Sequence, residues 1–159
     1  MRLLLYYRNT RGITAVEALV GITIVAMVLV FGAHTVIRFL TVGGEVGEKT
    51  QALYLAEEGL EMVKFIRDVE WDTIAGLTDG ATYYLSVSGV SVVVSGTPET
   101  IGIFSRSFVV EPVERNADDD IVASGTDDDD SKYVTVTVSW GSPAQSLSFT
   151  TIVADINNP

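Results

Sequence analysis

Glu17 is the first residue of this chain whose type and position could do chemistry, because it is a lone carboxylate near the start of a long apolar run, Ile13 to Ile37. A carboxylate inside an apolar membrane span costs about 2.5–3.5 kcal/mol on insertion scales, and such residues are usually functional. The chemistry that it offers there is to pair with a cation. The alternative is that Glu17 lies near the membrane boundary, where the cost is lower and the residue is tolerated without a purpose.

A second group of carboxylates lies far along the chain, between Arg115 and Lys132. Hard cations such as calcium take several oxygen ligands from one loop. The calcium ligands that we consider are Asp118, Asp120, Asp127 and Asp129. An EF-hand is rejected, because Lys132 stands at the position of its glycine and Val138 at that of its glutamate. A looser calcium loop and a solvated, self-repelling hairpin tip both stay open, and we expect no other cofactor.

The sequence contains no motif that indicates catalysis. The one histidine, His34, lies in the apolar run, where it cannot join a serine and an aspartate in a hydrolytic triad. The sequence has no glycine-rich phosphate loop and no HExxH motif. The net charge of −11 argues against nucleic acid as a partner, and the cations Arg106, Arg115 and Lys132 are scattered among acids. The sequence therefore predicts a structural or binding protein and not an enzyme.

The apolar run is long enough to cross a membrane. As a helix, Ile13 to Ile37 covers about 37 Å, against about 30 Å for a bilayer core. The arginines of the leader, residues 1–12, favour a cytoplasmic N-terminus, although Arg38 at the far end argues against that orientation. A secretory signal peptide predicts a shorter apolar core and a small-x-small cleavage site. A plain signal-anchor helix fits the length but leaves Glu17 unexplained.

These residues resemble the type III signal of the type IV pilin family, which includes the pseudopilins of type II secretion. In that family a basic leader ends in glycine, a prepilin peptidase cuts after it and methylates the new N-terminus, and the fifth mature residue is glutamate. Here Gly12 would precede the cut, Ile13 would become the mature N-terminus and Glu17 is fifth. The resemblance covers residues 1–40. Isoleucine in place of the more usual phenylalanine, and His34 where major pilins often have proline, favour a minor pilin or pseudopilin.

The resemblance implies that Gly12 and Ile13 form a processing site and that Glu17 acts in assembly. The position of Glu17 also has a physical explanation that is independent of the family. It lies four residues after Ile13 on one helix face, so it could offset the mature amine or pair with the amine of a neighbouring subunit and fix the axial stagger. The implied partners are a prepilin peptidase, other pilin subunits, an inner-membrane assembly platform and the membrane. The implied location is the cytoplasmic membrane and then an extracytoplasmic filament or the cell surface.

The remaining sequence predicts an α+β fold, with a long N-terminal helix packed on an antiparallel sheet of four or five strands. Apolar residues at three-and-four spacing predict an amphipathic helix over 41–70, whose core stripe is Ala52, Leu55, Ala56, Gly59, Met62, Val63 and Ile66. Its solvated face is expected to hold Glu57, Glu58 and Glu61. Beyond Trp71 the period changes to two, and a strand is expected to end, or to lie at an edge, at Pro112.

The expected domains are a leader over 1–12, a membrane or filament-core helix over 13–40, the amphipathic helix over 41–70 and a sheet head over 71–159. The favoured function is a minor pilin, processed after Gly12 and assembled into a type IV pilus or related filament. A pseudopilin of a type II secretion or DNA-uptake system is the alternative of the same class. An unprocessed, single-pass, membrane-anchored binding domain is the alternative of another class.

Overall fold

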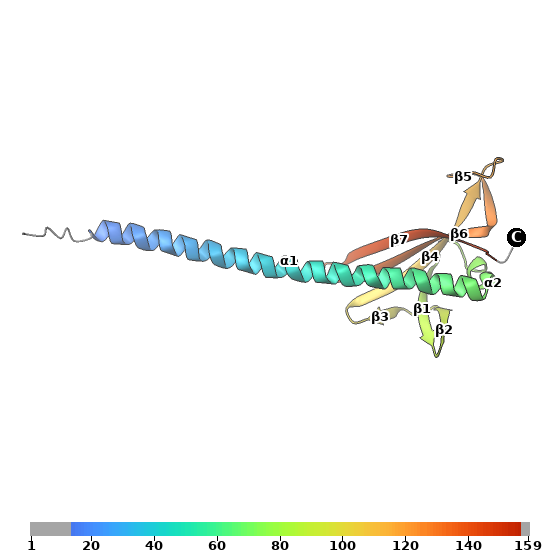
Figure 1. Cartoon of the computed structure of the whole chain (residues 1–159), viewed down its shortest axis with the longest axis horizontal. Coiled ribbons are helices and arrows are strands. Elements are labelled where there is room, and N and C mark those ends of the chain that lie inside the picture. Colours follow the sequence, from blue (N-terminus) through green and yellow to red (C-terminus); the bar gives the residue numbers. More distant parts are fainter. Residues whose placement is uncertain (1–13, 157–159) are drawn as a thin grey trace, which may run out of the picture. The chain divides into compact units, whose positions relative to one another are not determined.

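The computed structural model describes residues 14–156. The chain divides into two units, and the boundary between them lies between Glu45 and Val46. We call the second unit the head domain. Helix α1 covers Ala15–Val69 and is followed by a short helix α2, Trp71–Ala75 (Figure 1). The strands are β1 (Thr82–Ser88), β2 (Ser91–Ser95), β3 (Glu99–Ile101), β4 (Phe104–Arg115), β5 (Ile121–Val122), β6 (Thr126–Trp140) and β7 (Gln145–Ala154).

One antiparallel sheet holds all seven strands, which confirms the predicted α+β fold but not the predicted number of strands. The main path of the sheet is β2-β1-β4-β6-β7, and the two extra strands, β3 and β5, both pair with β4. These two strands have three and two residues, too few for an alternating pattern to be visible in the sequence. The sequence prediction of four or five strands therefore matches the main path.

The part of α1 within the head domain packs one face on this sheet. The buried residues of α1 are Ala52, Ala56, Gly59, Val63 and Ile66, all members of the predicted core stripe. Leu55 and Met62, the other predicted members, are partly buried against the same core. Burying this stripe removes apolar surface from water, which is the main force that holds the helix on the sheet.

The sheet contributes its side of the core through alternate residues of its two long central strands. Phe108 and Val110 of β4 are buried, as is every second residue over the last part of β6, namely Val134, Val136, Val138 and Trp140. On β7 the more buried face carries Leu147, Phe149, Thr151 and Val153, as the alternation predicts. Side chains that alternate across a strand allow one face to pack on α1 while the other stays polar.

Gly59 allows α1 to approach the sheet closely. A Cβ atom at this position would lie 2.9 Å from Cδ of Arg106 and 2.9 Å from Cγ1 of Val136. Both distances are shorter than ordinary carbon–carbon contacts, which are about 3.5–4.0 Å. The side chain of any other residue would therefore push the helix away from β4 and β6.

Two details of the predicted strands are wrong. Pro112 does not end β4, which continues to Arg115. At this position the pairing with β6 shifts register, so that Pro112 pairs with Lys132 and Val113 with Asp128. A bulge tolerates proline because the ladder already lacks a hydrogen bond there. The sheet region also does not start at Trp71, since α2 comes first and buries Trp71 and Ile74 in the core.

Candidate functional site

The predicted processing site, Gly12 and Ile13, lies outside the described residues. Glu17, the predicted assembly residue, lies in the first turn of α1 and is exposed. A carboxylate in this position interacts favourably with the positive end of the helix dipole. The candidate functional site that the structure describes is therefore the start of α1 and the apolar helix that follows it.

Thr14 is the N-cap of α1, a role that we did not predict. Its hydroxyl oxygen Oγ1 accepts a hydrogen bond from the backbone N–H of Glu17 at 3.3 Å, and its carbonyl oxygen accepts one from the N–H of Ala18 at 3.1 Å. The sequence signal was available, because threonine followed three residues later by glutamate is the pattern of a capping box. The described bond uses the backbone of Glu17 and leaves its carboxylate available for the role in assembly that we predict.

The first part of α1 buries no side chain against the described part of the chain. Its large apolar residues are all at least half exposed, among them Leu19, Ile22, Val28, Leu29, Phe31, Ile37 and Leu40. Exposure of so much contiguous apolar surface to water is unfavourable, so this surface needs lipid or other helices around it. Helix α1 is long enough and apolar enough to cross a membrane. The structure therefore supports single-pass anchoring through this helix.

Two threonines within the apolar part of α1 satisfy their hydroxyl groups inside the helix. The hydroxyl of Thr23 donates to the carbonyl of Leu19 at 2.8 Å, and that of Thr35 donates to the carbonyl of Phe31 at 2.9 Å. An unpaired hydroxyl would be costly in hydrocarbon, and a bond to the carbonyl four residues back removes that cost. These threonines are therefore compatible with an apolar environment.

Glu17 and Arg38 bracket a stretch without Asp, Glu, Lys or Arg, from Ala18 to Ile37. At about 1.5 Å per residue, this stretch measures about 30 Å, the thickness of a bilayer core. Both charged groups can then lie at the two boundaries of the membrane, where a charge costs less than at its centre. This spacing accounts for Arg38, which the distribution of positive charge alone left unexplained.

A shallow groove runs along one face of α1 beside Glu17. It is lined by Glu17, Ala18, Gly21, Ile22, Val25, Ala26 and Leu29. A Cβ atom at Gly21 would meet nothing within 4 Å, so packing within the described chain does not require glycine there. Small residues on one helix face allow another helix to approach closely. In this groove Glu17 is the group that can pair with a cation of an approaching helix.

The acidic segment, for which a calcium loop and a solvated hairpin tip both stay open in the sequence, is partly strand. Asp127, Asp128, Asp129 and Asp130 belong to β6, which pairs with the end of β4. Asp118 and Asp120 lie in the turn before β5, where their backbone N–H groups each donate to Oδ1 of Asn116 at 2.9 Å. Within residues 14–156, no three His, Cys, Asp or Glu side chains lie together in a way that could hold a metal ion. The proposed calcium ligands Asp118, Asp120, Asp127 and Asp129 therefore do not form a preformed site.

Asp128 has a structural role in this segment. Its Oδ2 atom accepts hydrogen bonds from the hydroxyl of Ser131 and from Nε of Arg115, the latter at 2.6 Å. The bond from Ser131 and the charge-assisted bond from Arg115 lower the pKa of Asp128 below its ordinary value. The same ion pair raises the pKa of Arg115. The pair joins β4 to β6 at the bulge.

The three cations that the sequence places among acids, Arg106, Arg115 and Lys132, are ion-paired. Arg106 is only 1% exposed, and Lys132 donates to both carboxylate oxygens of Asp79 at 3.0 and 3.2 Å. The Arg106 guanidinium makes a bidentate pair with Glu99, through Nε and Nη2, at 2.8 Å each. Arg106, Arg115 and Lys132 therefore do not form the exposed basic surface that DNA uptake would need.

Arg106 also ties the sheet to α1. Its Nη1 atom donates to the carbonyl of Leu55 at 2.9 Å and to Oε2 of Glu58 at 3.1 Å. Glu58 is thus not only part of a solvated helix face, as we predicted. Burial opposes the charge of Arg106, but the hydrogen bonds and charges of Glu99 and Glu58 outweigh this effect and raise its pKa. The bonds from Arg106 to Leu55 and Glu58 fix the position of the sheet along α1.

The described residues thus contain one long helix, α1, that is apolar enough to cross a membrane and has a capped, acidic first turn. The last part of the same helix covers the sheet of the head domain. Comparison with protein-family models, with curated proteins and with solved structures found no match to this chain.

Proposed function

We propose that this chain is a prepilin-type structural subunit that is processed after Gly12 and assembled as a minor pilin into a type IV pilus or related filament. The observation that carries the proposal is α1 itself. Its first part exposes an apolar surface with one carboxylate in the first turn, and its last part belongs to the head domain. An anchor that also packs side by side with copies of itself in a filament needs these features.

The mechanism rests on the position of Glu17 relative to the mature N-terminus. After cleavage, the amine of Ile13 would stand directly before the N-cap residue Thr14. A positive amine at this end of a helix is unfavourable, because the helix dipole is also positive there. Glu17 offsets that charge within one subunit before assembly. In the filament, the carboxylate of one subunit pairs with the amine of the next, and an unpaired charge in the apolar bundle penalises any other stagger.

The proposal assigns the remaining parts of the chain to display and assembly. The membrane holds the subunit through α1 with the N-terminus in the cytoplasm, where a prepilin peptidase cuts and methylates it. An inner-membrane platform then transfers the subunit into the filament, and the head domain faces the outside. A pseudopilin of a secretion machine would use the same steps. The paired state of Arg106, Arg115 and Lys132 gives no support to binding of DNA.

The alternative function is an unprocessed, membrane-anchored binding domain. In that case Glu17 would serve only the helix terminus that Thr14 caps. If Glu17 serves only the helix terminus, glutamine can replace it, because a capping box accepts either residue. If Glu17 pairs with an amine, glutamine cannot replace it, because the pairing needs the negative charge. The variants Glu17→Gln and Glu17→Ala therefore separate the two roles.

The experiment compares these variants in cells that contain a type IV pilus machine and its prepilin peptidase. We expect both variants to insert into the membrane as well as the original chain. We expect their recovery in sheared filaments to fall at least about tenfold, which corresponds to about 1.4 kcal/mol of lost pairing. Glu57→Ala, which removes an exposed carboxylate of the same helix within the head domain, is the control and should assemble normally. Full recovery of Glu17→Gln would count against the pairing and favour the capping role.

A further inference from the structure

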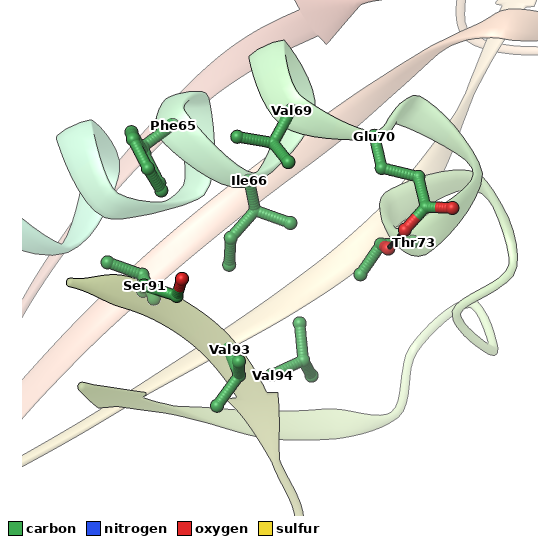
Figure 2. A pocket seen from close by; sticks show the side chains of 9 residues that line it. Phe65, Ile66, Val69, Glu70, Thr73, Ser91, Val93 and Val94 are labelled. Atoms are coloured by element: carbon green, nitrogen blue, oxygen red, sulfur yellow. Dashed lines mark hydrogen bonds between the residues drawn. The ribbon is translucent and has the colours of Figure 1, made fainter. Parts of the chain in front are cut away.

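A cavity of about 410 Å³ lies in the head domain between the end of α1 and strand β2. We call it the α1–β2 cavity. It is lined by Phe65, Ile66, Val69, Glu70, Thr73, Ser91, Val92, Val93 and Val94 (Figure 2). The apolar side chains come from both α1 and β2, and Glu70 is the ionisable group among them. Figure 2 shows the end of α1 and the β2 strand facing one another across this space.

The open edge of β2 borders the cavity. Four consecutive residues of β2 line it, although successive side chains of a strand point to opposite faces. A space that contacts all four therefore touches the backbone of β2 as well as its side chains. β2 is the end strand of the main path of the sheet and pairs only with β1 among the described strands. The cavity therefore lies where a further strand would be added.

The register of the hairpin identifies which backbone groups are available. Ser88 pairs with Ser91 across a two-residue turn, so these residues exchange hydrogen bonds, as do Ser86 and Val93. The alternate residues of β2, Val92 and Val94, then direct their N–H and C=O groups away from β1. These are the donors and acceptors that an added strand would use.

The hairpin lacks the features that usually protect a sheet edge. No charged residue occurs between Asp79 and Glu99, and β2 itself contains no proline. Val90 at the hairpin tip is 98% exposed, and Val87 and Val93 are also exposed. Natural sheets usually block such an edge with lysine, proline, a bulge or a covering segment. An unprotected apolar edge in a chain of net charge −11 is therefore a candidate for a binding surface.

We propose that the α1–β2 cavity receives an extended segment of a partner protein, which adds to β2 as a new strand. Alternate apolar side chains of that segment pack against Phe65 and Val69 on one side and Val94 on the other. Glu70 borders the cavity and accepts a hydrogen bond only from the hydroxyl of Thr73 among the bonds of its side chain that the structure describes, at 3.1 Å, whereas the nearby Asp68 is paired with Arg67. Asp72 lies two residues after Glu70 in the chain, so the segment carries a lysine or arginine at the Glu70 end. Strand addition of this kind takes its affinity from main-chain hydrogen bonds and its specificity from such pockets.

The test starts from the full chain in lipid nanodiscs and a phage-displayed library of random peptides, with empty nanodiscs as the counter-selection. We expect the selected peptides to alternate apolar residues and to carry a basic residue near one end. In hydrogen exchange by NMR, a synthetic selected peptide should slow exchange at the N–H groups of Val92 and Val94. The N–H of Val93 should change little, because β1 already protects it. Failure to select any peptide above empty nanodiscs would overturn the proposal.

Two variants and one modified peptide decide whether the backbone edge is the binding element. Val94→Pro removes an outward N–H without removing a bond to β1. It should lower the affinity for the peptide about tenfold. Glu70→Gln should weaken peptides with a basic residue and leave matched neutral peptides unchanged. A peptide N-methylated at alternate amides should lose binding to the unaltered chain, which excludes misfolding of a variant as the cause. If the N-methylated peptide binds equally well, the cavity binds apolar groups and not a strand.

The same exchange measurement tests a second copy of the chain as the occupant. Protection of Val92 and Val94 that rises with protein concentration, without any peptide, would mean that two β2 strands pair with each other. That result would overturn the assignment to a partner protein. Protection that depends on the peptide and not on protein concentration supports it.

Discussion

Replacing Gly59 with alanine is expected to destabilise the head domain, although alanine is the better helix former. The new Cβ atom would lie 2.9 Å from Cδ of Arg106 and from Cγ1 of Val136. Neither neighbour can move easily. Val136 belongs to the central strand β6, and the Arg106 guanidinium is held by Glu99, Glu58 and the carbonyl of Leu55. The helix must then shift away from the sheet.

The expected magnitude is the difference of two effects. Overpacking a core by one methyl group costs about 1–3 kcal/mol. Replacing glycine by alanine inside a helix returns about 0.5–1 kcal/mol. The net loss in the free energy of unfolding is therefore about 1 kcal/mol. Gly47→Ala is the matched control in the same helix, because a Cβ atom there meets nothing within 4 Å, and it should stabilise by about 0.5–1 kcal/mol.

The assay is urea unfolding of the full chain in detergent, followed by tryptophan fluorescence. Trp71 and Trp140 are the two tryptophans of the chain and both lie in the core of the head domain, so the signal reports that domain. The predicted result is a lower midpoint for Gly59→Ala and a higher midpoint for Gly47→Ala. If both variants raise the midpoint equally, the close approach of α1 to the sheet at Gly59 is refuted.

Three further predictions use the same preparation. Arg106→Met should lower the free energy of unfolding in urea by about 3 kcal/mol, because Glu99 is left partly buried without its partner. Adding Glu99→Gln should restore part of this loss. No restoration would mean that Arg106 acts by packing alone. Asp128→Asn should reduce stability at neutral pH. The pKa of Asp128 is lower in the folded chain than its ordinary value of 3.8, so the ionised side chain stabilises the fold at any pH above 3.8. That difference from the original chain should shrink as the pH falls below 3.8 through the lowered pKa, and a constant difference down to acid pH would exclude the charge as the cause. Thr14→Val should speed exchange of the Glu17 amide hydrogen by about fivefold, as expected for a cap of about 1 kcal/mol, without changing the unfolding midpoint of the head domain; equal exchange would exclude the cap.

The sequence predicted those parts of the fold that depend on local periodicity. The stripe from Ala52 to Ile66 has a helical period, and the residues from Val134 to Trp140 have a period of two, so each pattern indicates both the element and its buried face. A helix stripe and an apolar sheet face must cover each other, which fixes the α+β arrangement. Strands of two or three residues carry no such pattern, and β3 and β5 were missed for that reason.

The sequence did not reveal contacts between residues far apart in the chain. Arg106 bonds to the carbonyl of Leu55 across 51 positions, and nothing local distinguishes this arginine from a surface residue. Its partner Glu58 lies among other acids of a helix face and looked solvated for the same reason. The role of Asp128 depends on the bulge opposite Pro112, which only the register of β4 and β6 makes visible. A run of aspartates by itself predicted a loop.

In the candidate site, one residue was predicted from the sequence and another was missed. Glu17 could be predicted, because a single carboxylate in an apolar run is conspicuous. Thr14 was missed although the spacing of threonine and glutamate is the signal of a capping box. The separation of Glu17 from Arg38 also lay in the sequence, and its meaning became clear once both residues were placed in one continuous helix.

The most direct test of the proposed function is the intact mass and N-terminal sequence of the chain, expressed with and without a prepilin peptidase. We expect a mature chain that starts at Ile13 and carries one added methyl group when the peptidase is present. Without the peptidase, the leader over residues 1–12 should remain. A chain that keeps this leader under both conditions would exclude processing as a prepilin and would favour an unprocessed, membrane-anchored domain.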